Sequence, residues 1–303
     1  MENFVITISC LLIGLLIRRI SAFPSETGNV LNLFVIYISL PALVLLKIPD
    51  LVFSKSLLVP ALMPWLMLIL SAISILFLSK LLKWDRPTTG CLLLVIPLGN
   101  TSFLGIPMVD SFFGEQAIPY AVLYDQLGSF LALATYGSVI LAFYTSDKES
   151  PTAGIILKKI MSFPPFIAMT LAFFLTFVLK TSPYPTIVVN LLNILASTLV
   201  PIAMVAVGFQ LTLKLKKEVI SQLSIGLSIK LIIAPMVALF LCSIVELEGE
   251  AVKVSIFESA MPPMISAGAL AIMANLAPKL AAGLVGIGIM LSFITLPILF
   301  QFL

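Results

Sequence analysis

The sequence contains no histidine and has few charged residues. Of its 303 residues, 17 are Lys or Arg and 14 are Asp or Glu, which is 10% of the chain, whereas a soluble domain carries about 25%. Hydrophobic residues make up 60% of the chain, and the net charge is only +3. This composition excludes an ordinary soluble enzyme, a disordered chain and a nucleic-acid-binding protein. It predicts an all-α polytopic membrane protein.

The absence of several chemical motifs narrows the function further. Without histidine there is no His-based triad or proton relay, and most zinc sites are excluded. Cys10, Cys91 and Cys242 lie inside apolar runs, show no CxxC spacing and are expected to be small buried hydrophobes. The sequence has no P-loop, HExxH or GxSxG motif. We therefore expect no enzyme activity, no cofactor and no metal centre.

Ten apolar segments are candidates for membrane-spanning helices, which need about 20 mostly apolar residues each. They are 3–17, 28–47, 56–80, 88–113, 117–145, 160–180, 187–212, 219–245, 252–274 and 280–302. The first segment lacks a basic leader and an Ala-x-Ala cleavage site. We therefore expect it to be a retained helix and not a signal peptide.

Basic residues alternate between the loops in a way that predicts the orientation. If the amino terminus lies outside, the inner loops hold twelve of the 17 basic residues, namely Arg18, Arg19, Lys80, Lys83, Arg86, Lys148, Lys158, Lys159, Lys214, Lys216, Lys217 and Lys279. The outer side then holds only Lys47, Lys55, Lys180 and Lys253, and Lys230 lies within a span. Because inner loops of membrane proteins are enriched in Lys and Arg, both termini are predicted to lie on the outer side of the cell membrane.

The chain divides into two halves of five spans each. The most polar stretch, SDKESPTAG at 146–154, separates a first repeat at 1–150 from a second at 151–303. Since five is odd, the second repeat must enter the membrane in the opposite sense. This predicts two inverted repeats, an architecture common among secondary transporters.

The fourth and ninth spans share an unusual interruption. They read IPLGNTSFLGIPMV at 96–109 and ESAMPPMISAGALA at 258–271, with prolines, glycines and polar residues in mid-span. Proline cannot donate a backbone hydrogen bond, and a freed carbonyl in hydrocarbon must be satisfied inside the protein. Two such sites at corresponding places predict two broken helices that form a transport site. If the two helices cross, they put unwound backbone and helix ends near the membrane midplane. Ordinary proline kinks are the alternative.

The same two segments carry a family resemblance. GNTSFLGIPM closely resembles the fourth-helix motif of the auxin efflux carrier family. ESAMPPMISAGALA, followed by KLAAGLVGIGIMLSFITLPI at 279–298, resembles that family's ninth and tenth helices. The resemblance extends over essentially the whole chain, and the short central loop is similar to that of bacterial members, some of which are associated with malate or malonate transport.

The resemblance implies a fold related to the bile acid–sodium symporters. It implies a scaffold of helices 1, 2, 6 and 7 and a transport domain of helices 3–5 and 8–10, with broken helices 4 and 9 crossing. It also implies an elevator motion, in which the transport domain slides against the scaffold, and a homodimer.

Four ionisable residues within the spans are candidates for function, because such residues are costly in a bilayer. Lys230, near the centre of the eighth span, either attracts an anionic substrate or pairs with a carboxylate. Asp125 and Glu258 are candidate coupling-ion residues for H⁺ or Na⁺. The alternatives are that Asp125 ties helices together and that Glu258 pairs with Lys230. Asp110 follows the first break near the outer end of its span and is expected simply to face outer solvent.

Neutral groups at the two breaks complete the candidate site. The substrate-binding candidates are Asn100, Thr101, Ser102, Pro107, Pro262 and Pro263, together with Lys230. Asn100 is the strongest of them, because the family motif includes it and because an Asn side chain both donates and accepts hydrogen bonds. Asn190, Asn193 and Gln210 are expected to bond other helices or headgroups.

Three functions are compatible with these features. The favoured one is a secondary transporter of small organic anions, either mono- or dicarboxylates, with proton coupling as one option. The second is a sodium-coupled symporter of the same anions. The third is a non-transporting membrane sensor or intramembrane enzyme, against which the short loops and the lack of a soluble output domain argue.

Overall fold

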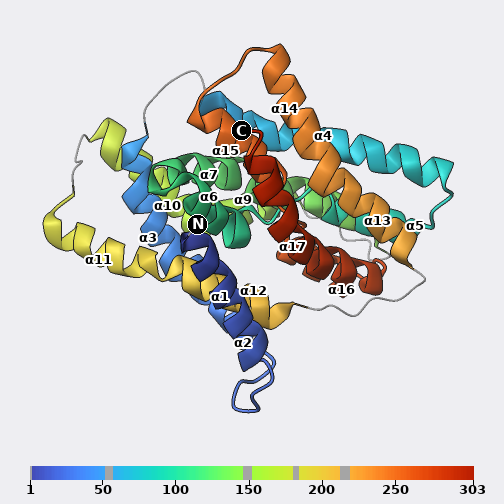
Figure 1. Cartoon of the computed structure of the whole chain (residues 1–303), viewed down its shortest axis with the longest axis horizontal. Coiled ribbons are helices and arrows are strands. Elements are labelled where there is room, and N and C mark those ends of the chain that lie inside the picture. The colour runs from blue at the N-terminus through green and yellow to red at the C-terminus, as the bar shows by residue number, and fades with distance from the viewer. Residues whose placement is uncertain (1, 52–56, 146–151, 180–183, 212–218) are drawn as a thin grey trace. The chain divides into compact units, whose positions relative to one another are not determined.

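A computed structural model describes residues 2–51, 57–145, 152–179, 184–211 and 219–303 (Figure 1). Within these ranges the secondary structure is helical apart from one isolated β-bridge. Most of the predicted central loop at 146–154 lies outside the described residues. So do six of the lysines used to predict orientation, namely Lys55, Lys148, Lys180, Lys214, Lys216 and Lys217.

The chain folds into two compact units, and each is described by itself. Unit 1 comprises Met1–Ser54, Ser102–Val122 and Leu157–Leu211, and unit 2 comprises Lys55–Thr101, Leu123–Ile156 and Thr212–Leu303. Three helical elements cross the unit boundaries, namely η4 (Thr101–Gly105), α7 (Ile118–Leu123) and α9 (Ala153–Met161).

Unit 1 is built from apolar helices whose ends are set by loops and prolines. Its elements are α1 (Glu2–Ile17), α2 (Thr27–Phe34), η1 (Val35–Ser39), α3 (Leu40–Lys47), η2 (Ile48–Asp50), α6 (Ile106–Phe113), η5 (Glu115–Ala117), α10 (Pro164–Phe173), η8 (Phe174–Val178), α11 (Thr186–Ser197) and α12 (Leu199–Gln210). Helices α1 and α12 pack closely because Gly14 and Gly208 present no side chain where the two helices meet. A Cβ atom on Gly208 would lie 2.1 Å from the carbonyl oxygen of Leu11.

Unit 2 contains the longest of the described α-helices and a large hydrophobic core. Its elements are α4 (Leu58–Leu81), α5 (Arg86–Val95), η6 (Tyr124–Phe130), η7 (Leu133–Gly137), α8 (Ser138–Tyr144), α13 (Ile220–Ser228), η10 (Ile229–Ile233), α14 (Ala234–Ile244), α15 (Glu250–Ser259), α16 (Ile265–Met273) and α17 (Pro278–Phe300). Helix α5 begins at an N-cap, where the backbone N–H of Thr88 donates to the Asp85 carboxylate over 3.0 Å.

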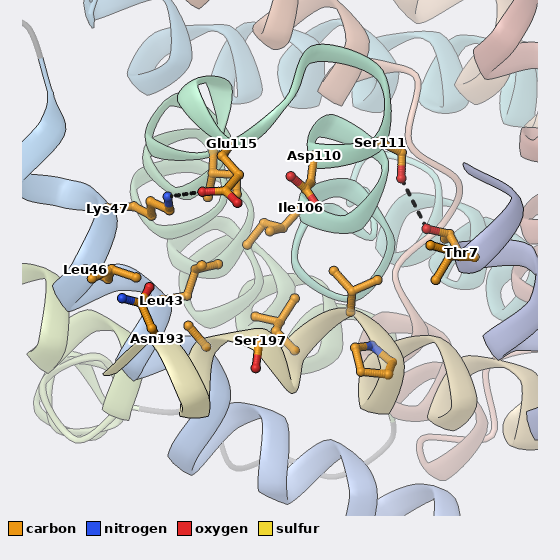
Figure 2. Close-up of a pocket in the computed structure, with 16 residues that line it drawn as sticks. Thr7, Leu43, Leu46, Lys47, Ile106, Asp110, Ser111, Glu115, Asn193 and Ser197 are labelled. Carbon is orange, nitrogen blue, oxygen red and sulfur yellow. Dashed lines mark hydrogen bonds and ion pairs between the residues drawn. The ribbon is translucent and has the colours of Figure 1, made fainter. Parts of the chain in front are cut away.

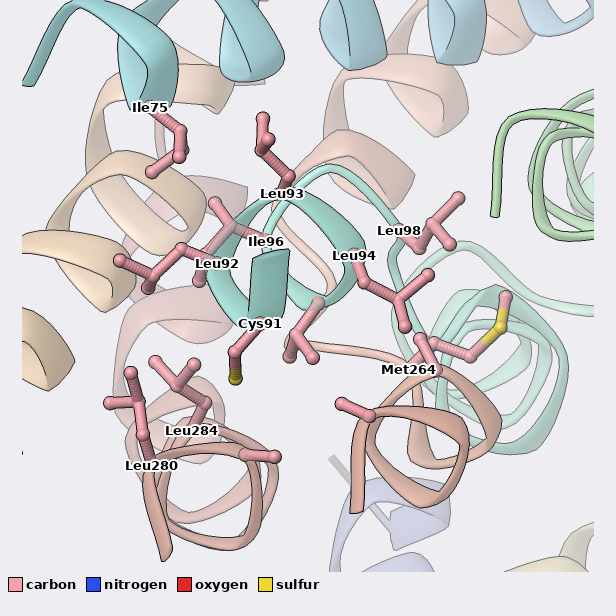
Figure 3. Packing of buried hydrophobic residues seen from close by; sticks show 14 of the residues in the cluster. Ile75, Cys91, Leu92, Leu93, Leu94, Ile96, Leu98, Met264, Leu280 and Leu284 are labelled. Carbon is pink, nitrogen blue, oxygen red and sulfur yellow. The ribbon is translucent and has the colours of Figure 1, made fainter. Parts of the chain in front are cut away.

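The second half of helix α5 is buried on all sides, and every residue from Cys91 to Ile96 is apolar. Each of these residues is at most 2% exposed. Leu280 and Leu284 of α17 and Ile75 of α4 pack around the helix (Figure 3). The core therefore holds α5 rigidly up to the point where its helical structure ends, and this fixes the position of the first break.

In the described part of the chain, six continuous helical segments are long and apolar enough to cross a membrane. They are Thr27–Lys47, Leu58–Leu81, Glu115–Tyr144, Thr186–Gln210, Ile220–Ile244 and Pro278–Phe300. Phe4–Ile17 and Pro164–Val178 are shorter apolar helices at the first and sixth predicted spans. The fourth and ninth predicted spans, 88–113 and 252–274, are interrupted. The chain is thus an α-helical polytopic membrane protein, while the count of ten spans and the inverted repeat stay predictions.

Wide π-helical turns recur inside these helices, and three of them precede a proline by two residues. The turns η1, η4 and η10 are followed by Pro41, Pro107 and Pro235. Proline lacks a backbone N–H, and its ring clashes with the carbonyl four residues earlier. In each case that carbonyl lies within the π turn, so the wider turn accommodates the ring without ending the helix. Such turns are often found at functional sites.

Candidate functional site

Two interrupted helices of unit 2 meet at their breaks. Helix α5 ends at Val95 and α15 ends at Ser259, and the extended segments that follow pair with each other. The N–H of Asn100 donates to the carbonyl of Pro262 over 2.8 Å, and the N–H of Met264 donates to that of Leu98 over 2.9 Å. Gly99 and Pro263 form an antiparallel bridge between these bonds. Each broken helix therefore satisfies backbone groups that the other exposes, as a low-dielectric environment requires.

A buried carboxylate lies beside this crossing. Asp125, in the π turn η6, is 1% exposed. Its Oδ1 accepts a 2.6 Å hydrogen bond from the Thr101 hydroxyl, and its Oδ2 accepts one of 2.6 Å from the Gln126 amide. Thr101 directly follows Asn100 in the sequence and is the first residue of the π turn η4. The carboxylate therefore ties the first break to η6 through short, charge-assisted bonds.

Helix α4 holds η6 in place through two close contacts. The indole N–H of Trp65 donates to the carbonyl of Leu127 over 2.9 Å. A Cβ atom on Gly128 would lie 2.1 Å from Cγ of Pro64, so only glycine allows this approach. The π turn that carries Asp125 is thus fixed by backbone contacts and not by the carboxylate alone.

Lys230 and Glu258 face the same small cavity at the crossing. Lys230 lies in the π turn η10 and is 3% exposed, and Glu258 in the last turn of α15 is fully buried. The cavity measures about 10 Å³, and its lining also includes Gly99, Thr101 and Tyr124. That is room for at most one water molecule or ion. A Cβ on Gly99 would lie 3.2 Å from the Lys230 ammonium nitrogen, so a side chain there would require the end of Lys230 to shift by a few tenths of an ångström.

Several buried polar atoms at the crossing have no hydrogen-bond partner among the described residues. They are Nδ2 of Asn100, Oε1 of Gln126 and both carboxyl oxygens of Glu258. Glu258 does interact electrostatically with Asp125 and with Lys230. Buried polar groups without partners are rare in folded proteins and require a reason. Here they form a cluster able to receive a proton, a small cation or a polar ligand atom.

Unit 1 contains a larger pocket of about 360 Å³ (Figure 2). Its lining combines apolar side chains with Lys47 of α3, Asp110 of α6, Glu115 of η5 and Asn193 of α11. The Lys47 ammonium lies 2.7 Å from Oε2 of Glu115. The volume falls within the range of small-molecule sites, which is about 300–1,000 Å³. Among the described residues, no group of His, Cys, Asp and Glu is arranged to hold a metal ion.

Comparison with known proteins identifies the family. The family model described as membrane transport protein matches residues 1–300, almost the full length of the chain. The chain belongs to this family, the auxin efflux carriers. It is 28% identical over 287 residues to an uncharacterized transporter of Methanocaldococcus jannaschii, covering 93% of this chain and 92% of the relative. It is 25% identical over 309 residues to an uncharacterized transporter of Methanothermobacter thermautotrophicus, covering 98% and 96%.

Membership in the auxin efflux carrier family makes this chain a membrane transport protein, with a transported substrate and a bilayer as its surroundings. The sequence motif that carries the resemblance, GNTSFLGIPM, includes both the first break and the start of α6. Its residues therefore divide between the two units.

Most of the predicted site residues of this auxin efflux carrier lie together in unit 2. The crossing and the cluster beside it contain Asn100, Thr101, Asp125, Lys230, Glu258, Pro262 and Pro263. Ser102 and Pro107 belong to unit 1 instead. Pro107 lies in the first turn of α6, where its carbonyl accepts a 2.7 Å hydrogen bond from Ser111.

The predicted pairing of Glu258 with Lys230 is electrostatic, without a direct hydrogen bond. The sequence makes Glu258 a candidate partner of Lys230, but its carboxyl oxygens accept no hydrogen bond from any described residue. The two charged groups interact electrostatically, and both line the same cavity. The α-helical turn that carries Glu258 ends at Ser259, whereas Lys230 projects from a π turn of a separate helix.

Sequence reasoning misses functional candidates in unit 1. It treats Lys47 only as an outer-loop charge, expects Asn193 to bond other helices or headgroups, and expects Asp110 to face solvent. The structure places all three in the wall of one pocket. Spacing along the chain gives no signal for this grouping, because the residues come from three helices distant in sequence.

Proposed function

We propose that this auxin efflux carrier is a secondary transporter of small organic anions, such as mono- or dicarboxylates, and that it works by alternating access. The observation that supports it most is the pair of broken helices whose extended segments are joined by an antiparallel bridge between Gly99 and Pro263. Interrupted helices at corresponding places in two halves are typical of transporter sites, since they offer unwound backbone and helix ends to a ligand. Both termini are proposed to lie on the outer side of the cell membrane.

An elevator motion fits the division of the chain into two units. The first, second, sixth and seventh predicted spans, which form the scaffold in this proposal, fall within unit 1. The third, eighth, ninth and tenth predicted spans, which belong to the transport domain, fall within unit 2. So do the first half of the fourth span and most of the fifth. The second half of the fourth predicted span is α6, which packs on α1 within unit 1. The proposal also includes a homodimer, as in other members of the family.

The buried cluster supports ion coupling. Asp125 accepts hydrogen bonds at both carboxylate oxygens, whereas the carboxyl oxygens of Glu258, beside a cavity of single-ion size, accept none from the described residues. Glu258 is therefore the proposed carrier of a coupling proton, and Asp125 holds the site together. Neutralising Glu258 is expected to remove the proton dependence of uptake. Proton-dependent uptake that survived neutralisation of both carboxyl groups would contradict this role.

Sodium coupling is the second candidate, because the same free oxygens suit a small hard cation. Sodium needs several oxygen ligands in one place, and the hydroxyl of Thr101 lines the same cavity as Glu258. Replacing sodium by choline in the transport buffer distinguishes the two. Proton coupling predicts unchanged flux, and sodium coupling predicts its loss.

Asn100→Ala tests the location of the substrate site. The Nδ2 group of Asn100 is buried and has no hydrogen-bond partner among the described residues, so its removal breaks no hydrogen bond of that group. If the amide serves a substrate carboxylate, counterflow in proteoliposomes should fall at least about 10-fold with unchanged melting temperature, as expected for loss of a charge-assisted hydrogen bond. Asn190→Ala, on the exposed face of α11, is the matched control and should transport normally. Full activity of Asn100→Ala would move the substrate site away from the first break.

A further inference from the structure

A cavity of about 520 Å³ lies in unit 2 where helices α4, α5 and α8 end or begin. Helix α4 ends at Leu81, α5 begins at Arg86 and α8 ends at Tyr144. We infer that this cavity binds the phosphate headgroup of an anionic phospholipid, at a site separate from the transport site. The cavity is lined by Ser79, Trp84, Arg86, Thr89, Phe143 and Tyr144.

The described lining of this cavity offers hydrogen-bond donors and contains no carboxylate. One N–H of the Arg86 guanidinium donates to the carbonyl of Phe143, and its other N–H groups make no hydrogen bond with a described residue. The hydroxyls of Ser79 and Tyr144 and the indole N–H of Trp84 also have no hydrogen-bond partner among the described residues. Several donors around one cavity suit a ligand with several acceptor oxygens and a negative charge, such as a phosphate.

The turn after α4 holds Trp84 beside the end of that helix. Lys83 has a φ of 52°, and the backbone N–H of Trp84 donates to the carbonyl of Ser79 over 3.0 Å. This is the hydrogen-bond pattern of a Schellman motif, in which a residue in the left-handed conformation ends the helix. The backbone on both sides of the Trp84 side chain is therefore fixed at the cavity.

Arg86 and Tyr144 are held together at the same cavity. The guanidinium carbon of Arg86 lies 5.8 Å from the centroid of the Tyr144 ring, which is a cation–π contact. A Cβ on Gly90 would lie 2.8 Å from Cβ of Tyr144, so the glycine lets α5 approach α8 this closely. Groups that are already positioned lose less entropy when a ligand binds them.

The segment between α4 and α5 is positively charged. Lys80, Lys83 and Arg86 are all exposed, and Asp85 is the one carboxylate between residues 80 and 86. The Asp85 carboxylate already accepts the N–H of Thr88 at the start of α5. In the proposed orientation this end of unit 2 faces the inner side, where anionic lipids attract clusters of basic residues.

Exposed apolar side chains next to the donors favour a lipid over a free anion. Phe143 is 68% exposed and lines the cavity, and Leu81 and Leu82 at the end of α4 are 64% and 46% exposed. Helix α4 is long and apolar enough to span a bilayer, so its end lies at the depth of the headgroups. The acyl chains of a phospholipid can cover these side chains while its phosphate contacts the donors, whereas free phosphate cannot.

Lipid titrations of the purified full chain in a neutral detergent test the inference, with the first bound lipid quantified by native mass spectrometry. Dioleoylphosphatidylglycerol and dioleoylphosphatidylcholine share acyl chains and a phosphate but differ in net charge. The native protein should bind phosphatidylglycerol at least about 10-fold more tightly, because each basic residue near a headgroup favours an anionic lipid by about 1 kcal/mol.

Three variants locate the site. Arg86→Gln should weaken phosphatidylglycerol binding at least about 10-fold by removing charge-assisted hydrogen bonds. Trp84→Phe keeps an aromatic ring, removes the indole N–H and should weaken binding by about 3-fold. Arg19→Gln removes an exposed arginine of unit 1 that does not line the cavity, and as the matched control it should bind like the native protein. Melting without added lipid shows whether each variant is folded.

Three results would overturn the inference. One is equal affinity of the native protein for the two lipids. Another is phosphatidylglycerol binding that the folded Arg86→Gln protein retains in full; if that variant does not fold, the double variant Ser79→Ala, Trp84→Phe takes its place. The third is displacement of phosphatidylglycerol by an equal concentration of glycerol 3-phosphate, since the exposed apolar side chains would then contribute nothing to binding.

Discussion

Replacing Lys230 with methionine is expected to abolish organic-anion exchange and to lower the free energy of unfolding by about 3–5 kcal/mol, because it removes one partner from a buried charge cluster. Lys230 is the cation in the described lining of the cavity at the crossing, and it interacts electrostatically with Glu258. Without it, the buried Glu258 loses its nearby positive charge and keeps the repulsion from the buried Asp125. Counterflow in proteoliposomes and thermal melting in detergent measure the two effects.

A double variant separates the structural effect of Lys230 from its functional one. Adding Glu258→Gln to Lys230→Met removes the carboxyl group that has no hydrogen-bond partner among the described residues, so most of the lost stability should return. Exchange should stay absent, because the coupling group and the cation are both missing. Normal exchange by Lys230→Met alone would show that the buried cation takes no part in transport.

Introducing a methyl group at Gly208 is expected to prevent stable packing of α1 against α12. The new Cβ would lie 2.1 Å from the carbonyl oxygen of Leu11, and a backbone carbonyl cannot turn away as a flexible side chain can. Alanine favours a helix over glycine by about 1 kcal/mol, so the collision must outweigh that gain. We expect Gly208→Ala to destabilise the protein by about 3 kcal/mol, the upper end for overpacking, and to lower the melting temperature clearly.

Two related variants serve as comparisons. Gly14→Ala should behave like Gly208→Ala, because its Cβ would lie 2.2 Å from the carbonyl oxygen of Val205 on the opposite helix. Gly154→Ala in α9 meets no atom within 4 Å and should melt like the native protein. Equal melting temperatures for all three variants would mean that α1 and α12 do not approach each other as closely as described.

The sequence predicts the local features of this fold well. Apolar runs locate the helical segments, because hydrophobicity over about 20 residues is a strong signal for a spanning helix. The prolines and glycines at 97–107 and 262–263 locate the two interruptions, because those residues cannot sustain a regular helix at those points. The sequence also predicts that backbone groups freed at the breaks find partners inside the protein, and the structure supplies these partners by pairing the two breaks.

Other features depend on packing between distant segments and have no local signal. The π turns that carry Thr101, Asp125 and Lys230 arise from proline in only two cases, and η6 has no proline directly after it. One boundary between the units falls within the fourth predicted span, between Thr101 and Ser102, although the motif GNTSFLGIPM runs through it without interruption. The pocket around Lys47 and Asp110 likewise forms only when three helices assemble.

Trans-stimulated exchange of a labelled organic acid by the native protein in proteoliposomes tests the central claim most directly. An alternating-access carrier returns faster when loaded, so unlabelled acid inside should accelerate uptake of labelled acid outside, and uptake should saturate. Asn100→Ala should lose both properties. Uptake that rises linearly with concentration, or that is insensitive to acid on the opposite side, in protein shown to be folded and inserted, would contradict a carrier with its site at the crossing.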